Sequence, residues 1–262
     1  MERSIVVKLG GATIEQAGVI EELAADLRDM PDVFPIIVHG GGSEIGRYLE
    51  LLGKEFTFVK GLRVTDGDMV EIVEMVLSGK INKELVSRFQ HNGVNALGVS
   101  GKDMGLLRAE RYRKDGVDIG FVGEIVEVNT ALFELCASHR VTPVVSPISG
   151  GTNGETYNVN ADHAALDIAR AVACDDVIFI SDVAGICRSD GRALRRLTPE
   201  LAEALIEAGE ITGGMIPKVH SALECLSHGV GRARIIAWQG PGTLQKELAS
   251  EESVFGTVVT TG

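Results

Sequence analysis

Glycine turns placed beside short apolar runs are the feature that most constrains this chain. Gly10-Gly11 follows the apolar run 5–7, the triplet 40–42 follows the run 36–38, and Gly213-Gly214 opens a helical pattern. Glycine at a strand-to-helix turn lets backbone N–H groups approach an anion without a Cβ in the way. We therefore expect buried strands that lead into helices, with phosphate bound where they meet.

Short β-branched runs alternate with amphipathic stretches along most of the chain. In the stretch 66–77, for example, the apolar residues share one helical face. Such alternation predicts the α/β class, here a three-layer αβα sandwich with a mainly parallel central sheet. Ligands in this class bind at the carboxyl ends of the strands. Buried strands are predicted at 5–9, 34–38, 94–99, 141–145, 177–180 and 234–237, and a hairpin turn at 150–154.

The composition excludes several classes of partner. The 262 residues carry a formal net charge of −12, which argues against a nucleic-acid or anionic membrane surface. No run approaches the ~20 apolar residues of a membrane helix, and Lys8 interrupts the N-terminal apolar stretch too early for a signal peptide. We expect a cytoplasmic protein without a protein-held metal, because no metal-ligand spacing surrounds the free thiols of Cys136, Cys174, Cys187 and Cys225.

The common nucleotide-binding signatures are absent from the sequence. There is no G-x-x-x-x-G-K-[ST], and Ile45 stands where G-x-G-x-x-G needs its third glycine. Lys8 would be interpreted as a solvated strand-end lysine if it stood alone. The Gly10-Gly11 turn beside it favours a phosphate contact instead. His39 is interpreted as a structural histidine rather than a general base.

Other polar residues in apolar surroundings leave two interpretations each. Arg63 forms either a surface salt bridge or a planar fork for a substrate carboxylate. Asn158, Asn160 and Asp162 alternate, so their side chains share one face if the segment is extended. An N-cap for the following helix is the alternative, and it suits Asn160. Asp182 ends a strand, either as a turn residue or at the edge of a nucleotide pocket.

Taken in order, the segments 8–11, 39–42, 61–65, 82–83, 157–162, 182–186 and 213–219 resemble the amino acid kinase family and, within it, the group of N-acetyl-L-glutamate kinases. Lys-x-Gly-Gly at 8–11 indicates the broad family. Gly-Leu-Arg-Val-Thr at 61–65 combined with Asn-Val-Asn-Ala-Asp at 158–162 is much more specific to that group. The resemblance covers almost the whole chain.

The resemblance implies transfer of the γ-phosphoryl group of ATP to the side-chain carboxylate of N-acetyl-L-glutamate, the second step of arginine biosynthesis. Lys8 and Lys218 would stabilise the phosphoryl group, Asp162 would orient both lysines, and Gly11 would donate a backbone N–H. Mg²⁺ would arrive with ATP. The acceptor would be held by Gly41, Gly42, Arg63 and Asn158. The nucleotide site would be formed by Gly10, Asp182, Val183, Ala184, Gly185, Ile186, Cys187, Glu210, Ile211 and Thr212.

The resemblance also implies how the chain is organised. Residues 1–175 would form an N-terminal lobe for acceptor binding and dimerisation, and residues 176–262 a C-terminal lobe for ATP. Because seven residues precede Lys8, we expect a homodimer that arginine does not inhibit. Some relatives bind a nitrogen-signalling protein, and the sequence does not decide on that partner. Two alternatives stay open: a kinase of the same fold acting on carrier-linked aminoadipate, and a non-catalytic nucleotide-binding sensor.

Overall fold

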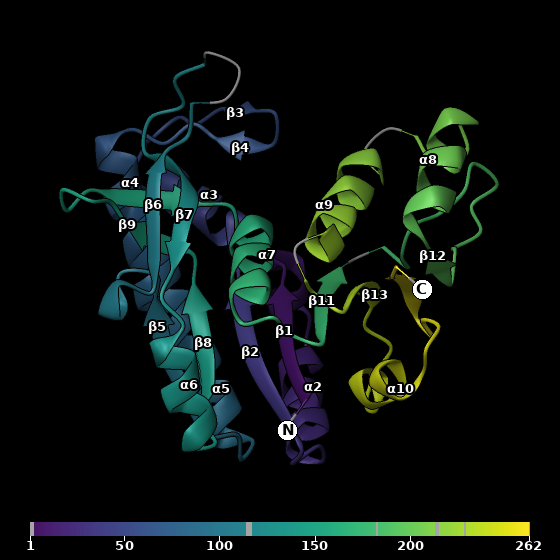
Figure 1. Ribbon diagram of the computed structural model, residues 1–262. Coiled ribbons are helices and arrows are strands. Elements are labelled where there is room, and N and C mark those ends of the chain that lie inside the picture. Colours follow the sequence, from purple (N-terminus) through teal and green to yellow (C-terminus); the bar gives the residue numbers. More distant parts are fainter. Residues whose placement is uncertain (1–2, 114–116, 182, 213–214, 228, 262) are drawn as a thin grey trace.

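A computed structural model of the protein describes residues 3–113, 117–181, 183–212, 215–227 and 229–261. Its centre is an eight-stranded sheet with the strand order β12-β14-β13-β11-β1-β2-β8-β5 (Figure 1). The strands from β13 to β5 are parallel, and β14 is antiparallel to β13. Their bounds are β1 (Arg3–Leu9), β2 (Val33–His39), β5 (Ala96–Ser100), β8 (Thr142–Ser146), β11 (Asp176–Ser181), β12 (Arg196–Leu197), β13 (Arg232–Ala237) and β14 (Gly256–Val259).

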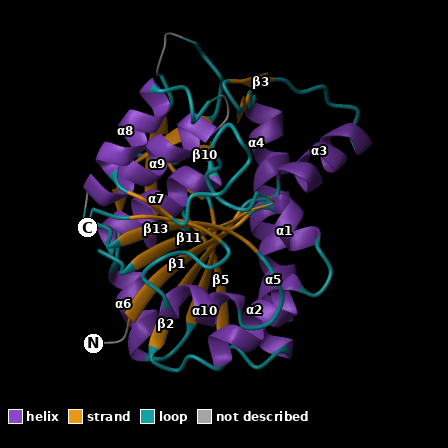
Figure 2. Cartoon of the chain, turned by 90° about the vertical axis from the view of Figure 1, so that its right-hand side faces the viewer, coloured by secondary structure: helices purple, strands orange, loops and turns teal. Residues whose placement is uncertain are grey.

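Helices cover both faces of this sheet, which confirms the predicted αβα sandwich (Figure 2). One face carries α6 (Ala131–Ser138), α7 (Ala161–Ala171), α8 (Pro199–Glu207) and α9 (Met215–Ser227). The other carries α1 (Gly11–Glu15), α2 (Val19–Arg28), α5 (Asn82–His91) and α10 (Thr243–Ala249). Within the described ranges, no helix has the length and apolar character needed to cross a membrane.

Strand β1 is buried on both sides because its apolar residues serve two separate cores. Val6 belongs to the core under α6–α9, whereas Ile5 and Val7 belong to the core under α2, α5 and α10. A continuous apolar run is what a doubly covered parallel strand requires. All six predicted strands lie in this sheet, and the sheet continues from β1 into β11 without a break. The lobe boundary at residue 175 stays a prediction.

A second, smaller sheet and a separate hairpin lie beside the central sheet. Strands β6 (Leu107–Arg111), β7 (Val122–Val128), β9 (Ile148–Gly150) and β10 (Thr156–Val159) close on one another as a barrel, next to the short helix η2 (Asp103–Gly105). Strands β9 and β10 pair antiparallel, which confirms the predicted hairpin turn. The hairpin consists of β3 (Phe58–Val59) and β4 (Leu62–Arg63).

The predicted amphipathic stretch 66–77 is helical, but its last three residues are wound differently from the rest. Helix α3 (Gly42–Leu51) precedes it, and α4 (Gly67–Glu74) starts at Asp66, whose side chain accepts a hydrogen bond from the Met69 backbone N–H at 2.8 Å. The chain then continues through the π-helical segment η1 (Met75–Ile81) into α5. Such π-helical turns often occur at functional sites, and this one contacts the glycine turn after β2.

Candidate active site

The carboxyl ends of three neighbouring parallel strands meet at one edge of the central sheet. The strand registers set Leu9 of β1 beside His39 of β2 and beside Ile180 of β11. Helices α1 and α3 begin just after the glycine turns at this edge, at Gly11 and Gly42. Two cavities open here, of about 410 Å³ and about 300 Å³, which we call the first cavity and the second cavity.

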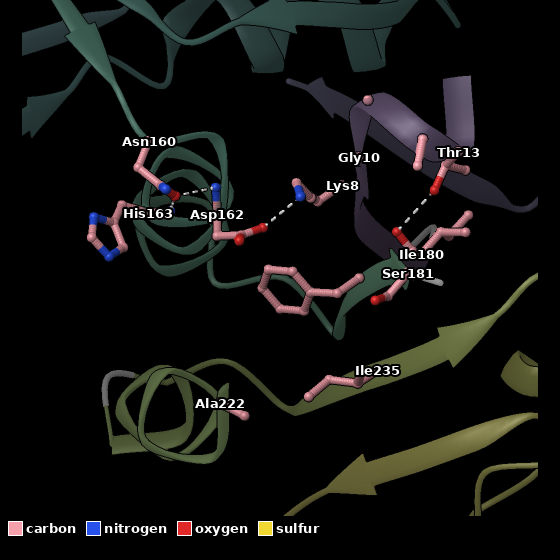
Figure 3. Close-up of a pocket in the computed structure, with 13 residues that line it drawn as sticks. Lys8, Gly10, Thr13, Asn160, Asp162, His163, Ile180, Ser181, Ala222 and Ile235 are labelled. Carbon is pink, nitrogen blue, oxygen red and sulfur yellow. Dashed lines mark hydrogen bonds and ion pairs between the residues drawn. The ribbon is translucent and has the colours of Figure 1, made fainter. Parts of the chain in front are cut away.

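Lys8 lines both cavities. It is the last but one residue of β1, and its side chain reaches towards α7, where Nζ lies 2.8 Å from Oδ1 of Asp162 (Figure 3). The lysine side chain is 16% exposed and that of the aspartate 49%. A cation held by a carboxylate in this way has a fixed position and can still meet an anion in either cavity.

Asp162 owes its position to the way α7 begins. Asn160 caps this helix, and its side-chain oxygen accepts hydrogen bonds from the backbone N–H groups of Asp162 and His163 at 2.8 and 3.2 Å. The N-cap interpretation of Asn160 is therefore right. The extended interpretation is wrong for the third member of the set, since the helix turns Asp162 away from the line of Asn158 and Asn160. Asn158 and Asn160 line the second cavity, and Asn160 and Asp162 line the first.

The first cavity lies between β1, β11, α7 and the elements that follow β11 (Figure 3). Ala222 of α9 and Ile235 of β13 form the wall opposite Lys8 and Asp162. The sequence does not predict these two apolar residues as part of the site, because Ala on a helix and Ile on a strand are typical of the hydrophobic core. The described lining is Lys8, Gly10, Gly11, Ala12, Thr13, Asn160, Asp162, His163, Phe179, Ile180, Ser181, Ala222 and Ile235.

Of the residues predicted for the nucleotide site, Gly10 lines the first cavity, and the others follow β11 and precede α9. Residues 183–187 and Glu210, Ile211 and Thr212 are outside the described lining of the first cavity. The two segments are nevertheless neighbours, because Ser189 Oγ donates a hydrogen bond to Glu210 Oε2 at 2.8 Å. Asp182 and Gly213-Gly214 lie outside the described residues. Lys218 lies on α9, and its side chain is likewise outside the description. These assignments stay predictions.

The second cavity is built around the glycine turn after β2. An ideal Cβ on Gly41 would lie 2.1 Å from Cδ1 of Ile81, so any other residue at this turn would require the side chain of Ile81 to shift. The predicted acceptor residues Gly41, Gly42, Arg63 and Asn158 all line this cavity. The full lining is Lys8, Gly10, Gly11, Gly40, Gly41, Gly42, Ile45, Phe58, Gly61, Leu62, Arg63, Leu77, Val122, Pro147, Asn158, Val159, Asn160 and Ala161.

Arg63 is buried, with 8% of its surface exposed, so the surface salt bridge considered from the sequence is wrong. Its Nη2 donates to the backbone oxygen of Gly42 at 2.9 Å. Its Nη1 is shielded from solvent and has no hydrogen-bond partner in the described part of the chain. Burial lowers the pKa of the guanidinium from its usual value, yet arginine stays charged in proteins. The cavity wall thus holds a charged donor for which the described residues provide no acceptor.

His39 is fully buried and takes part in a structural network, as the sequence interpretation has it. Nδ1 lies 3.1 Å from the Gly40 oxygen, and Nε2 lies 3.2 Å from Nδ2 of Asn82. Since the carbonyl oxygen can only accept, we assign the proton to Nδ1. Burial lowers the pKa of His39 to about 4. The ring is neutral at physiological pH and ties β2 to α5.

The arrangement suits the binding of a polyphosphate next to a second, smaller anion. Backbone N–H groups at the starts of α1 and α3 converge where the cavities join, and Lys8 adds a positive charge there. The described residues contain no group of three or more His, Cys, Asp or Glu side chains suited to a metal ion.

Comparison with known proteins places this chain in a family. The model of the amino acid kinase family matches residues 3–237. An acetylglutamate kinase of Caldanaerobacter subterraneus subsp. tengcongensis is 42% identical over 262 residues, which cover 98% of this chain and 87% of that relative. An acetylglutamate kinase of Allorhizobium ampelinum is 40% identical over 269 residues, covering 98% and 91%. The chain belongs to the amino acid kinase family.

Solved structures share the fold. The smu.665 protein of Streptococcus mutans UA159 superposes with a TM-score of 0.81 at 28% identity, over 100% of both chains. An N-acetylglutamate synthase of Neisseria gonorrhoeae superposes with a TM-score of 0.86 at 22% identity, covering 100% of this chain and 60% of that one. A carbamate kinase of Giardia gives 0.71 at 14% identity, over 100% of both chains. The last two support the fold alone.

Proposed function

We propose that this protein is an acetylglutamate kinase, which transfers the γ-phosphoryl group of ATP to the side-chain carboxylate of N-acetyl-L-glutamate. The observation that carries the proposal is the position of Lys8, which lines both cavities and is held by Asp162 at 2.8 Å. A transferring phosphoryl group has to pass between a nucleotide and an acceptor, and this lysine stands where the two would meet. Relatives of that name match 98% of the chain at about 40% identity.

The reaction needs positioning and charge stabilisation more than it needs a base. One carboxylate oxygen of the acceptor attacks the γ-phosphorus, the bond to the β–γ bridging oxygen breaks, and ADP leaves with that electron pair. The acceptor carboxylate is already ionised at neutral pH, so no proton has to be removed. Lys8 and Lys218 would stabilise the transferring group, Asp162 would fix the lysines, and Gly11 would donate its backbone N–H.

ATP would occupy the first cavity, with Gly10 at its phosphate end. The residues proposed for its base and sugar are Asp182, Val183, Ala184, Gly185, Ile186, Cys187, Glu210, Ile211 and Thr212. Mg²⁺ would enter with the nucleotide, held by phosphate oxygens and water. A cation bound in this way neutralises the developing charge on the phosphates.

N-Acetyl-L-glutamate would occupy the second cavity. Its α-carboxylate would meet Arg63, whose unpartnered Nη1 matches a carboxylate oxygen in charge and hydrogen-bonding type. Gly41 and Gly42 would present backbone N–H groups, and Asn158 would add a side-chain amide. Asn158 lies on β10, where its Nδ2 donates a hydrogen bond to Oγ1 of Thr65 at 3.3 Å.

The first test is ATP-dependent formation of an acyl phosphate, trapped as a hydroxamate with hydroxylamine. N-Acetyl-L-glutamate is compared with glutamate, aspartate and N-acetyl-aminoadipate. Hydroxamate formed from N-acetyl-L-glutamate alone is the expected result. Signal from N-acetyl-aminoadipate alone would move the substrate to the aminoadipate class. Protein that binds ATP and gives no hydroxamate with any acceptor would be a nucleotide sensor.

We extend the proposal to the setting of the enzyme, which is a cytoplasmic homodimer acting in arginine biosynthesis. Strand β5 ends the central sheet, and Leu97 on it is 41% exposed. A strand at the edge of a sheet with an exposed apolar residue is a surface that a second copy can cover. Light scattering coupled to size-exclusion chromatography should give twice the mass of the chain. A monomer at micromolar concentration would contradict the dimer.

A further inference from the structure

The guanidinium of Arg63 contacts two aromatic rings. Its Cζ lies 4.1 Å from the centroid of the Phe56 ring and 4.7 Å from that of the Phe58 ring. The rings themselves meet edge to face, with centroids 5.9 Å apart and planes at 84°. A cation over an aromatic face within about 6 Å is attracted by the ring quadrupole. Arg63 therefore has two such contacts, and the rings lie on adjacent sides of its guanidinium, since their centroids are only 5.9 Å apart.

The fold holds this arrangement in two independent ways. Phe58 and Arg63 are directly opposite each other in the antiparallel hairpin β3–β4, and such residues have side chains on the same face of the ribbon. Phe56 is held from the other side by α3, where an ideal Cβ on Gly46 would lie 3.4 Å from Phe56 Cζ and 3.9 Å from Arg63 Nη2. Glycine within a helix is less favourable than alanine, and here it leaves room for the ring and the guanidinium.

The two rings differ in exposure. Phe56 is half-buried and packs against the core on the α3 side. Phe58 is 55% exposed and lines the second cavity. Nη1 of Arg63, unpartnered among the described residues, is shielded from solvent. Leaving a buried donor without a partner costs free energy. An acceptor oxygen that reaches Nη1 recovers that cost.

We propose that Phe56 and Phe58 are positioning residues that act through Arg63 and set the affinity for the carboxylate of the acceptor. This inference rests on the proposed function. Phe56 forms the fixed wall behind the guanidinium. Phe58 is the cover that keeps water away from Nη1, so the carboxylate of the acceptor does not compete with solvent for this donor. The site would recognise the carboxylate of a small molecule.

The expected size of the effect follows from the cation–π contact. Such contacts are worth about 0.5–2 kcal/mol, which corresponds to a roughly 2- to 30-fold change in a binding constant. Phe58→Leu should raise the KM for N-acetyl-L-glutamate by such a factor and leave the KM for ATP unchanged. Phe255→Leu is the matched control, since that ring also faces a cation, Lys246 Nζ at 5.9 Å, away from both cavities.

Two further measurements separate positioning from mere structural support. Replacing Phe58 site-specifically with phenylalanines of increasing fluorination weakens the ring quadrupole and keeps its shape, so the KM for the acceptor should rise stepwise. In an Arg63→Met background the Phe58→Leu change should no longer affect that KM. A flat fluorination series, or an undiminished effect without the arginine, would overturn the proposal.

The outcome for the wild-type protein keeps this inference apart from the proposed function. If the wild type forms no hydroxamate from N-acetyl-L-glutamate, the proposed function itself fails. If the wild type is active and Phe58→Leu has the wild-type KM for the acceptor, the function stands and the aromatic positioning fails. Equal losses for both substrates with a lowered melting temperature would assign the ring a structural role and likewise overturn the proposal.

Discussion

Lys8 and Asp162 form an ion pair of 2.8 Å that joins β1 to α7 where the two cavities meet. Lys8 belongs to β1 of the central sheet and Asp162 to the first turn of α7, so the fold sets the geometry of the pair. Asp162 is fixed in turn by the cap of its helix, because its backbone N–H donates to Asn160 at 2.8 Å. A charge placed before the reaction needs no reorganisation during it, which is the basis of electrostatic preorganisation.

Removing either lysine should lower turnover more than nucleotide affinity. We expect Lys8→Ala and Lys218→Ala each to reduce kcat by at least ~10²-fold, as for other losses of one preorganised charge. Steady-state kinetics with calorimetric ATP binding measures both quantities. Lys54→Ala serves as the control, because Lys54 pairs with the exposed Asp68 on the surface. Wild-type turnover in either catalytic variant would refute the assignment.

Asp162→Asn tests the anchor of Lys8 without changing the shape of the side chain. The loss of the negative charge should lower kcat by about 10- to 100-fold, or roughly 1.4–2.7 kcal/mol of barrier. Asp190→Asn is the control, since Asp190 pairs with Arg192 in an exposed loop. Circular dichroism should show an intact fold in both variants. Equal turnover in the two variants would contradict the role of Asp162.

Gly41→Ala should disturb the turn between β2 and α3. The added methyl would meet Ile81 at 2.1 Å, and such overpacking costs about 1–3 kcal/mol. We expect a less stable protein with a raised KM for the acceptor, measured by thermal unfolding and kinetics. Gly79→Ala on η1 is the control, because its Cβ would meet nothing within 4 Å. Gly41→Ala with the stability of the wild type would show that the turn adapts.

The stability of the protein should depend on pH through His39. Burial lowers the pKa of this histidine to about 4, whereas in the unfolded chain it is about 6.5. Between these values the unfolded state binds more protons, so the free energy of unfolding falls as the pH is lowered from 6.5 to 4. The contribution, roughly 3 kcal/mol, is complete at neutral pH.

Chemical denaturation at pH 7 and at pH 4.5 measures this dependence. The wild type should lose more stability over that interval than His39→Gln does, because the variant lacks the titrating group. His139→Gln should behave as the wild type does, since His139 is exposed at the end of α6. Parallel losses in the wild type and His39→Gln would disprove the role of His39.

Arg234 should matter for stability and not for catalysis. It is fully buried, with Nε 2.9 Å from Asp176 Oδ1 and Nη1 3.1 Å from Glu247 Oε2. Arg234→Met would remove the cation paired with the buried Glu247 and would leave Asp176 its contacts with Arg3 and Arg232, a loss of about 3–5 kcal/mol. Arg192→Met, at an exposed arginine, should cost little. Unfolding curves and the KM values for both substrates check this prediction, and a changed KM with unchanged stability would contradict it.

The sequence predicts the central sheet because its buried strands are continuous Ile- and Val-rich runs. It misses β12 and β14, whose pairing depends on β13 and on residues far away in the chain. It also misses the π-helical winding of η1, which has no distinct apolar period. For Asn160 the sequence allows two interpretations, a residue on one face of an extended strand and the N-cap of the following helix. The cap prevails because its side chain satisfies two backbone N–H groups.

The candidate site was predicted less evenly. The glycine turns and Lys8 can be recognised from the residues next to them in the sequence. The contact of Lys8 with Asp162 joins residues far apart in sequence, so it can be predicted only from the fold or from the resemblance to a known family. Phe58 was overlooked, although the two-residue connection at Lys60-Gly61 between β3 and β4 is a hairpin signal that sets it against Arg63. The side chain of Lys218 and all of Asp182 lie outside the described residues, so their roles stay predictions.

Lys8, Gly10, Gly11 and Asn160 line both cavities, and this shared wall restricts how the family can diversify. A substitution at any of the four alters both pockets at once, so selection cannot adjust the affinity for one ligand there without changing the other. New specificities have to arise at positions that belong to a single cavity, such as Phe58 on one side and Ala222 on the other. The four shared residues thus keep the reaction the same, whereas residues that line a single cavity determine which substrate is bound.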